Sequence, residues 1–148
     1  MELTFREAAL ADLERVVELI ADDAVAAGRT GSYGEPHIRA FEAIAASPDN
    51  ELVVAESDGA VIGVMQLTFI PGISRNGASR LLVEAVRVSS ELRGQGIGRR
   101  LMDHAHERGR ARGCALAQLT SDKQRPEAHR FYRGLGYEQS HEGFKLPL

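Results

Sequence analysis

The sequence predicts an α/β domain of the α+β kind, with a mixed, mostly antiparallel sheet of about six or seven strands flanked by about four helices. Two apolar, valine-rich runs, 52–55 and 60–69, are separated by Ser57, Asp58 and Gly59, which is typical of a β-hairpin. Segments before and after these runs carry an apolar residue at every third or fourth position, which indicates amphipathic helices. The chain therefore contains both strand patterns and helix patterns.

Length and composition fit one soluble domain, residues 1–148. The chain has 148 residues, a size at which a single hydrophobic core is expected. Its 43% hydrophobic and 26% charged residues exclude a disordered chain, and no apolar run approaches the roughly 20 residues that span a bilayer. The net charge of -3 argues against a nucleic-acid partner. A single cysteine, Cys114, and the lack of a signal-peptide pattern predict a cytoplasmic protein.

Each element follows from its own residue pattern. Besides the hairpin, alternation of polar and apolar residues predicts strands over 2–6, 81–88 and 115–120, with one or two more within 137–146. The helical period predicts helices over 10–28, 36–46, 96–112 and 126–135. Pro36 and Pro126 suit helix starts, and Gly113 suits a helix end.

The segment Val86–Arg100 combines a strand, a tight turn and a helix start. Three alternating glycines between Arg93 and Arg99 let the backbone approach an anion, and free N–H groups at the helix start attract it. A helix end contributes only about 0.3 to 2 kcal/mol, so a bound pyrophosphate would also need the arginines. The alternative is a glycine-assisted turn that binds nothing. Dinucleotide and P-loop motifs are excluded, because two arginines follow the last glycine and no Gly-Lys-Ser or Gly-Lys-Thr is present.

Two motifs carry a family resemblance. The run Arg93-Gly94-Gln95-Gly96-Ile97-Gly98 resembles the Q/R-x-x-G-x-G/A signature of the GNAT superfamily of N-acetyltransferases. Downstream, Ala128 to Tyr137 is similar to that family's A-x-x-F-Y-x-x-x-G-F/Y segment. The resemblance implies a GNAT-like sheet whose fourth and fifth strands splay apart. It also implies an enzyme that uses acetyl-CoA as cosubstrate and transfers the acetyl group directly to a primary amine of a small molecule.

The resemblance assigns acetyl-CoA to two stretches of the chain. The pantetheine arm would pair with the strand before the turn, at Val86, Arg87 and Val88. The pyrophosphate would be held by the turn and the helix start, at Arg93, Gly94, Gln95, Gly96, Ile97, Gly98 and Arg99. Arg125 departs from the family, because many members have Asn three residues before the motif's alanine. Arg125 is therefore a candidate for contacting a CoA phosphate instead.

Tyr132 is the candidate general acid, because it resembles the family's acid and its phenol can donate a proton to the CoA sulfur. Ala128, Phe131 and Leu135 form the inward stripe of the last predicted helix and leave Tyr132 on a neighbouring face. Aromatic packing is the alternative role for Tyr132.

Glu84 is the candidate general base for the acceptor amine. It lies four residues before Val88, so strand alternation predicts that Glu84, Val86 and Val88 share one face. A carboxylate there would be costly to bury without a partner. The alternative is therefore an ion pair with Arg87 or Arg80, or partial solvation.

We expect no metal, since His104 and His106 lie two apart on a helix and point away from each other. The acceptor is expected near the loops 28–35, 69–80 and 121–123, which the family uses. An amino acid derivative, a polyamine, an aminophosphonate and an antibiotic are all candidates. Two alternatives stay open: acetylation of a protein or peptide amine, and an acyl-CoA-binding sensor without turnover. Homodimers are frequent in the family.

Overall fold

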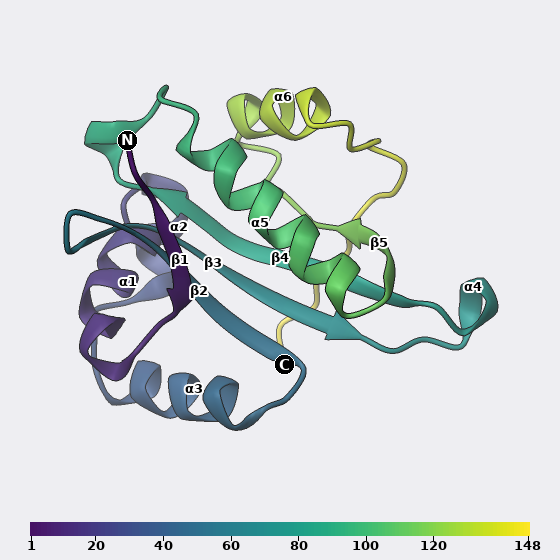
Figure 1. The fold of residues 1–148 in the computed structure, drawn as a ribbon, viewed down its shortest axis with the longest axis horizontal. Helices are drawn as coiled ribbons and strands as arrows, with labels where there is room; N and C mark the ends of the chain where they lie inside the picture. The colour runs from purple at the N-terminus through teal and green to yellow at the C-terminus, as the bar shows by residue number, and fades with distance from the viewer.

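One mixed sheet runs through the molecule in the order β1-β2-β3-β4-β5 (Figure 1). The computed structural model describes residues 1–148, apart from the side chain of Ala24. The strands are β1 (Thr4–Glu7), β2 (Asn50–Ser57), β3 (Ala60–Ile70), β4 (Ser79–Val88) and β5 (Cys114–Gln118). The first four are antiparallel to their neighbours and β5 runs parallel to β4. The prediction of a mixed, mostly antiparallel sheet is confirmed.

Six α-helices and two short 3-10 helices accompany the sheet. They are η1 (Leu10–Asp12), α1 (Leu13–Ile20), α2 (Ala24–Thr30), α3 (Glu35–Ala46), α4 (Ser74–Gly77), η2 (Ser90–Leu92), α5 (Ile97–Ala111) and α6 (Pro126–Gly134). The single helix predicted over 10–28 is wrong, because the chain turns at 21–23 and Asp23 caps a new helix by accepting a hydrogen bond from the Ala26 amide at 2.7 Å. The short α4 was not predicted.

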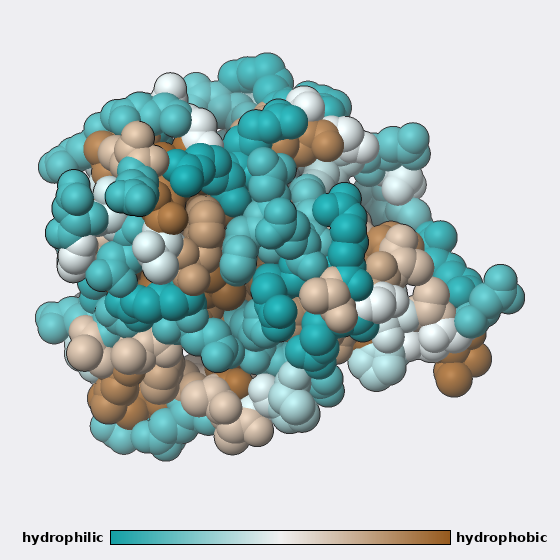
Figure 2. Space-filling model, viewed as in Figure 1, coloured by the Kyte–Doolittle hydropathy of each residue, from teal (hydrophilic) through white to brown (hydrophobic). Residues whose placement is uncertain are grey.

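The helices cover both faces of the sheet and bury two apolar clusters (Figure 1). Leu101, Met102 and Ala105 of α5 pack against one face, together with strand residues such as Met65 and Leu67. Leu13, Val16 and Leu19 of α1 pack against the opposite face, on Leu52, Val54 and Val64. The outer side of α5 is hydrophilic, and apolar groups appear near α3 (Figure 2). None of the described helices is long and apolar enough to cross a membrane.

The predicted strands within 137–146 are wrong. This segment follows α6, and no strand forms there in the part of the chain that the structure describes. Its residues alternate like a strand, but no neighbouring strand of the same chain pairs with them. The sheet consequently has five strands instead of six or seven.

Candidate active site

The second half of β4 has no strand beside it on the β5 side. Pairing between β4 and β5 covers Ser79 to Leu82 on β4 and ends at Gln118 on β5, whereas β4 continues to Val88. Backbone N–H and C=O groups that are left unpaired are costly unless water or a ligand satisfies them. Val86, Arg87 and Val88 all lie in this stretch, which the resemblance assigned to the pantetheine arm.

A bulge in β4 changes which side chains share a face. Opposite the two-residue step from Val64 to Gln66 on β3, β4 advances three residues, from Glu84 to Arg87. Ala85 takes the extra place with a φ of 54°, in the left-handed region. The alternation of side chains therefore reverses between Glu84 and Arg87.

The expectation that Glu84 shares a face with Val86 and Val88 is wrong for this reason. Glu84 pairs with Gln66 and Arg87 pairs with Val64, so both point to the face that α1 covers. Val86 and Val88 pack with the cluster under α5 instead. Glu84 is exposed, and no ion pair joins it to Arg87 or Arg80 among the described residues. Its carboxylate faces solvent on the α1 side of the sheet.

The glycine-rich turn connects β4 to α5 through η2. Gly94 and Gly96 have φ angles of 81° and 78°, which favour glycine over any residue with a side chain. A Cβ at either position would meet nothing within 4 Å, so the space above the turn is open. The first helical bond is donated by Arg100 to the Gly96 carbonyl at 3.2 Å, which leaves the amides before it without an intrahelical acceptor.

One side chain at the turn is buried in the core, and three others are exposed to solvent. Ile97 is 3% exposed and fixes the start of α5 in the core. Arg93, Gln95 and Arg99 are exposed. The Arg93 guanidinium lies 3.9 Å from the carboxylate of Asp22, just after α1. The turn thus presents backbone amides and two cations to solvent.

Tyr132 lies in α6, which packs against the start of α5. The Phe131 ring would be only 3.4 Å from a Cβ at Gly98, so the two helices are in close contact there. Tyr132 is half-buried, with its ring centroid 5.1 Å from Phe131 and 6.0 Å from Tyr137. Burial raises the pKa of the Tyr132 phenol, and the nearby positive charges of Arg87 and Arg125 oppose that rise only in part. The phenol therefore keeps its proton at neutral pH.

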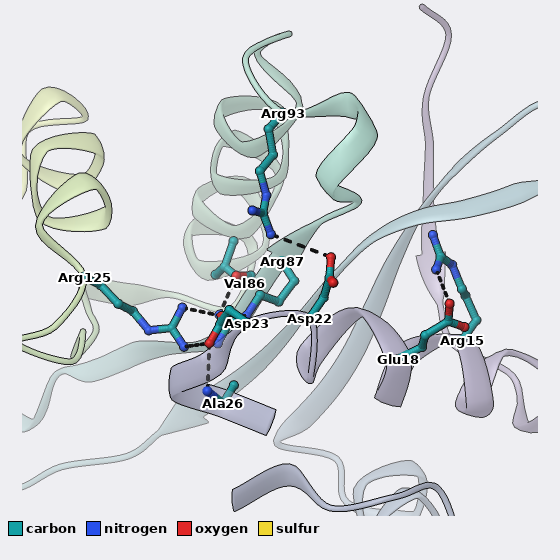
Figure 3. A network of polar contacts seen from close by, with 9 residues as sticks. All are labelled: Arg15, Glu18, Asp22, Asp23, Ala26, Val86, Arg87, Arg93 and Arg125. Carbon is teal, nitrogen blue, oxygen red and sulfur yellow. Dashed lines mark hydrogen bonds and ion pairs between the residues drawn. The ribbon is translucent and has the colours of Figure 1, made fainter. Parts of the chain in front are cut away.

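One carboxylate, Asp23, joins α2, β4 and α6 (Figure 3). It accepts hydrogen bonds from both terminal nitrogens of Arg125, at 2.9 and 3.1 Å, and its Oδ2 lies 3.6 Å from Nε of Arg87. Burial alone would raise the pKa of Asp23, but the Ala26 amide and the two arginines outweigh it and lower the pKa. Burial, reinforced by repulsion from Arg125, lowers the pKa of Arg87.

The ion pairs around Asp23 were not predicted from the sequence. Arg125 was expected near a CoA phosphate, and in this structure its guanidinium is bound to Asp23; contact with CoA stays a prediction. Arg87 also donates a hydrogen bond to the Val86 carbonyl at 2.8 Å. Arg29 of α2 lies 3.6 Å from Asp122 in the segment before α6. The only available sequence signal was Asp23, which precedes a helix-forming run as an N-cap residue does.

Other candidate groups have structural partners. His106 bonds the Tyr137 hydroxyl at 2.8 Å, and His104 stacks on Phe5 with ring centroids 4.8 Å apart. Among the described residues, no group of three His, Cys, Asp or Glu side chains lies close enough to hold a metal ion. Burial raises the pKa of the Cys114 thiol. None of these side chains belongs to the Asp23 cluster.

Comparison with known proteins identifies the family. The Acetyltransferase (GNAT) family model matches residues 13–137, which is most of the chain. The chain belongs to the GNAT acetyltransferases. This GNAT protein is 34% identical over 108 residues to the aminoalkylphosphonate N-acetyltransferase of Salmonella typhimurium, covering 73% of this chain and 70% of that one.

Solved structures share the fold of this GNAT protein. A protein of Bacillus halodurans C-125, described as a transcriptional regulator, superposes with a TM-score of 0.93 at 44% identity, over 99% of this chain and all of the other. An aminoglycoside N-acetyltransferase in complex with CoA superposes with a TM-score of 0.82 at 16% identity, over 99% of this chain and 95% of the other. The second likeness establishes the fold alone.

Proposed function

We propose that this GNAT protein transfers the acetyl group of acetyl-CoA directly to a primary amine of a small molecule. The observation that carries the proposal is the unpaired half of β4, which leads straight into the open glycine turn at the start of α5. An extended arm with amide groups fits beside such a strand, and a diphosphate fits above such a turn. Acetyl-CoA contains both groups in this order.

Two stretches of the chain would hold two parts of the cosubstrate. Val86, Arg87 and Val88 would pair with the pantetheine arm through their backbone groups. The amides from Gly94 to Arg99 would bind the pyrophosphate, with help from the exposed Arg93 side chain. Arg93 would leave Asp22, since the 3.9 Å ion pair between two exposed side chains is weak. The bound cosubstrate supplies an acetyl thioester.

Two side chains would move the protons of the reaction. Tyr132 would donate its phenolic proton to the departing sulfur, and its raised pKa keeps that proton available. Glu84 would accept the proton of the acceptor amine, directly or through water, from the face that α1 covers. In this arrangement the acid and the base act from opposite sides of the β4 strand.

The charge near α2 favours an acceptor that carries an acidic group. Arg29, Arg87 and Arg125 form ion pairs with only two carboxylates, those of Asp23 and Asp122. The cluster therefore has one cation more than it has anions, and guanidinium groups recognise carboxylates and phosphonates well. The Salmonella relative is named for an acceptor of this kind, an aminoalkylphosphonate. We also propose that this GNAT protein forms a homodimer, as many members of the family do.

An acceptor screen tests the proposal. CoA release would be measured with pairs of primary amines that differ only in a carboxylate or phosphonate, beside a polyamine and lysine-containing peptides. We expect turnover with small amines and higher kcat/KM for the acidic member of each pair. Turnover with peptides alone would instead favour a protein acetyltransferase, and tight acetyl-CoA binding without turnover would favour a sensor.

A Tyr132→Phe variant tests the acid. We expect kcat to fall by about 100- to 10,000-fold while the Kd for acetyl-CoA, measured by calorimetry, changes little. An unchanged kcat would remove Tyr132 from the mechanism and leave it a packing role.

A further inference from the structure

A polar cavity lies beside the first half of β4, at the end of the sheet where α4 is found (Figure 1). It measures about 300 Å³, which is at the small end of the range for sites that bind small molecules. Two arginines, two serines and a glutamine line it, which are Ser74, Arg75, Ser79, Arg80 and Gln118. None of the described residues that line it is acidic. The cavity therefore presents hydrogen-bond donors and two positive charges in a protein whose net charge is -3.

Arg80 has a fixed place in the sheet. Its backbone pairs with Ile70 of β3 on one side and with Leu116 of β5 on the other. Leu81, the next residue, is 1% exposed and packs under α5, so strand alternation turns the Arg80 side chain to the opposite face. The loop comes close to it at Gly72, where a Cβ would lie 3.4 Å from Nη1 of Arg80. The loop thus closes over an arginine whose backbone the sheet holds in place.

Arg75 lies at the cavity because the chain makes a left-handed turn within α4. Arg75, Asn76 and Gly77 have φ angles of 55°, 58° and 73°. The turn is closed by hydrogen bonds from the Gly77 amide to the Ile73 carbonyl and from the Ala78 amide to the Arg75 carbonyl, both at 3.2 Å. A left-handed backbone is unfavourable for residues with a side chain, and such residues are concentrated at functional sites. The unfavourable turn brings a cation to the cavity, which favours a binding role for Arg75.

The two arginines have no anionic partner in the part of the chain that the structure describes. Among the described residues, no ion pair or side-chain hydrogen bond involves Arg75 or Arg80. Positive charges that line one cavity repel each other, and an anion between them replaces this repulsion by attraction. A phosphate or phosphonate dianion matches both charges, and guanidinium groups bind its oxygens with charge-assisted hydrogen bonds. The serine hydroxyls and the glutamine amide can donate to the oxygens that remain.

This cavity is separate from the proposed site of acetyl transfer. Arg80 pairs with Ile70 of β3. Val64, the partner of Arg87, lies six residues earlier on the same strand. At about 3.3 Å per residue, the two ends of this stretch are about 20 Å apart. A small acceptor whose amine meets the thioester beside the second half of β4 does not reach the cavity, so an anion bound here is a different ligand.

We propose that the cavity between α4 and the first half of β4 binds the phosphate or phosphonate group of a small molecule, held by Arg75 and Arg80. The bound anion links the loop to the sheet. Its site is distinct from those of acetyl-CoA and of the acceptor amine. Binding here does not require acetyl transfer.

Nuclear magnetic resonance titration of the full chain tests this site, with inorganic phosphate and methylphosphonate as probes. The titration is made at pH 8, where both probes are mainly dianions, and at constant ionic strength. CoA is added first to occupy the glycine turn proposed for its pyrophosphate. We expect the amide signals of residues 74–80 and 116–118 to shift together and to saturate with one Kd. Acetate, with a single charge, should bind at least about 10-fold more weakly.

Two variants and a control identify the residues that bind. Arg75→Gln and Arg80→Gln should each weaken phosphate binding about 10- to 100-fold, because each removes charge-assisted hydrogen bonds. Arg75 is exposed, so Arg75→Gln should fold even if Arg80→Gln does not. Arg110→Gln on α5 is the matched control, since it removes an exposed arginine elsewhere and should leave the Kd unchanged.

Three results would each overturn the site: no saturable shift of these signals, an unchanged Kd in Arg75→Gln, or an equal loss in Arg110→Gln. The titration is repeated without CoA. A failure of CoA to bind would count against the proposed function alone, because the signals of residues 74–80 report on phosphate in either case.

Discussion

Replacing Asp23 by Asn removes the negative charge that links α2, β4 and α6, and so measures what that charge contributes to stability. Asn accepts the Ala26 amide bond as Asp does, so the cap of α2 is kept and only the negative charge is lost. Breaking a fully buried ion pair costs about 3–5 kcal/mol. The Asp23, Arg125 and Arg87 side chains retain 26%, 19% and 16% exposure, so we expect roughly half of that, about 2 kcal/mol.

Urea unfolding measures this loss, and thermal melting should show it as a fall in Tm of about 4–8 °C. The matched control is Asp49→Asn, which removes an ion pair to Arg112 from a side chain that is 54% exposed. That change should cost about 0–0.5 kcal/mol. If Asp23→Asn costs no more than Asp49→Asn, the argument that Asp23 neutralises a half-buried cluster is wrong.

The same variant has a defined pH dependence. The folded-state pKa of Asp23 lies below its ordinary value, so the stabilisation is complete above the unfolded pKa of about 3.9. It is lost as pH falls through the lower folded pKa. The stability difference between wild type and Asp23→Asn should therefore be constant from about pH 8 to pH 5 and close below about pH 4. A difference that widened on acidification would contradict this assignment.

Three further predictions concern the turn, the base and the thiol. Gly96→Ala should lower the free energy of unfolding by about 1–2 kcal/mol, because a side chain at a φ of 78° is strained. Gly98→Ala should not lower it, because a Cβ there meets Phe131 only at an ordinary contact distance of 3.4 Å; equal losses in the two variants would contradict this interpretation. Glu84→Gln should lower kcat/KM by about 100- to 10,000-fold at neutral pH and by less near pH 10, where the acceptor amine is already deprotonated; a constant ratio would point to positioning instead of base catalysis. Cys114→Ser should leave turnover unchanged, and iodoacetamide should modify the native Cys114 thiol slowly because burial raises its pKa.

Much of the fold was predictable because its signals are local. The hairpin turn at Asp58 and Gly59 and the helical period of α5 depend on residues close together in the sequence. The extra residue at Ala85 has no such signal, and it reversed the face assigned to Glu84. No strand formed within 137–146, although its residues alternate between polar and apolar. Alternation indicates which side chains would share a face, but it does not identify a strand with which the segment could pair.

The candidate site likewise contains one feature that was predictable from nearby residues and others that depend on the tertiary fold. The conformation of the glycine turn was predictable, since the spacing of its glycines indicates the left-handed backbone that Gly94 and Gly96 adopt. The Asp23 cluster was not, because Arg125 lies 102 residues away and only the tertiary fold brings the two together. The motif assigned Tyr132 as the acid for the CoA sulfur, but its neighbours Arg87 and Arg125 became visible only in three dimensions.

β4 extends beyond the end of its pairing with β5, so one edge of the second half of β4 has no neighbouring strand. A small molecule that lies along the bare edge supplies hydrogen-bonding groups that a protein strand would otherwise contribute. Occupancy and folding are then coupled, since whatever binds only the native chain raises its resistance to unfolding in proportion to the logarithm of its concentration. On the proposed function, acetyl-CoA would therefore stabilise the folded chain as well as react on it.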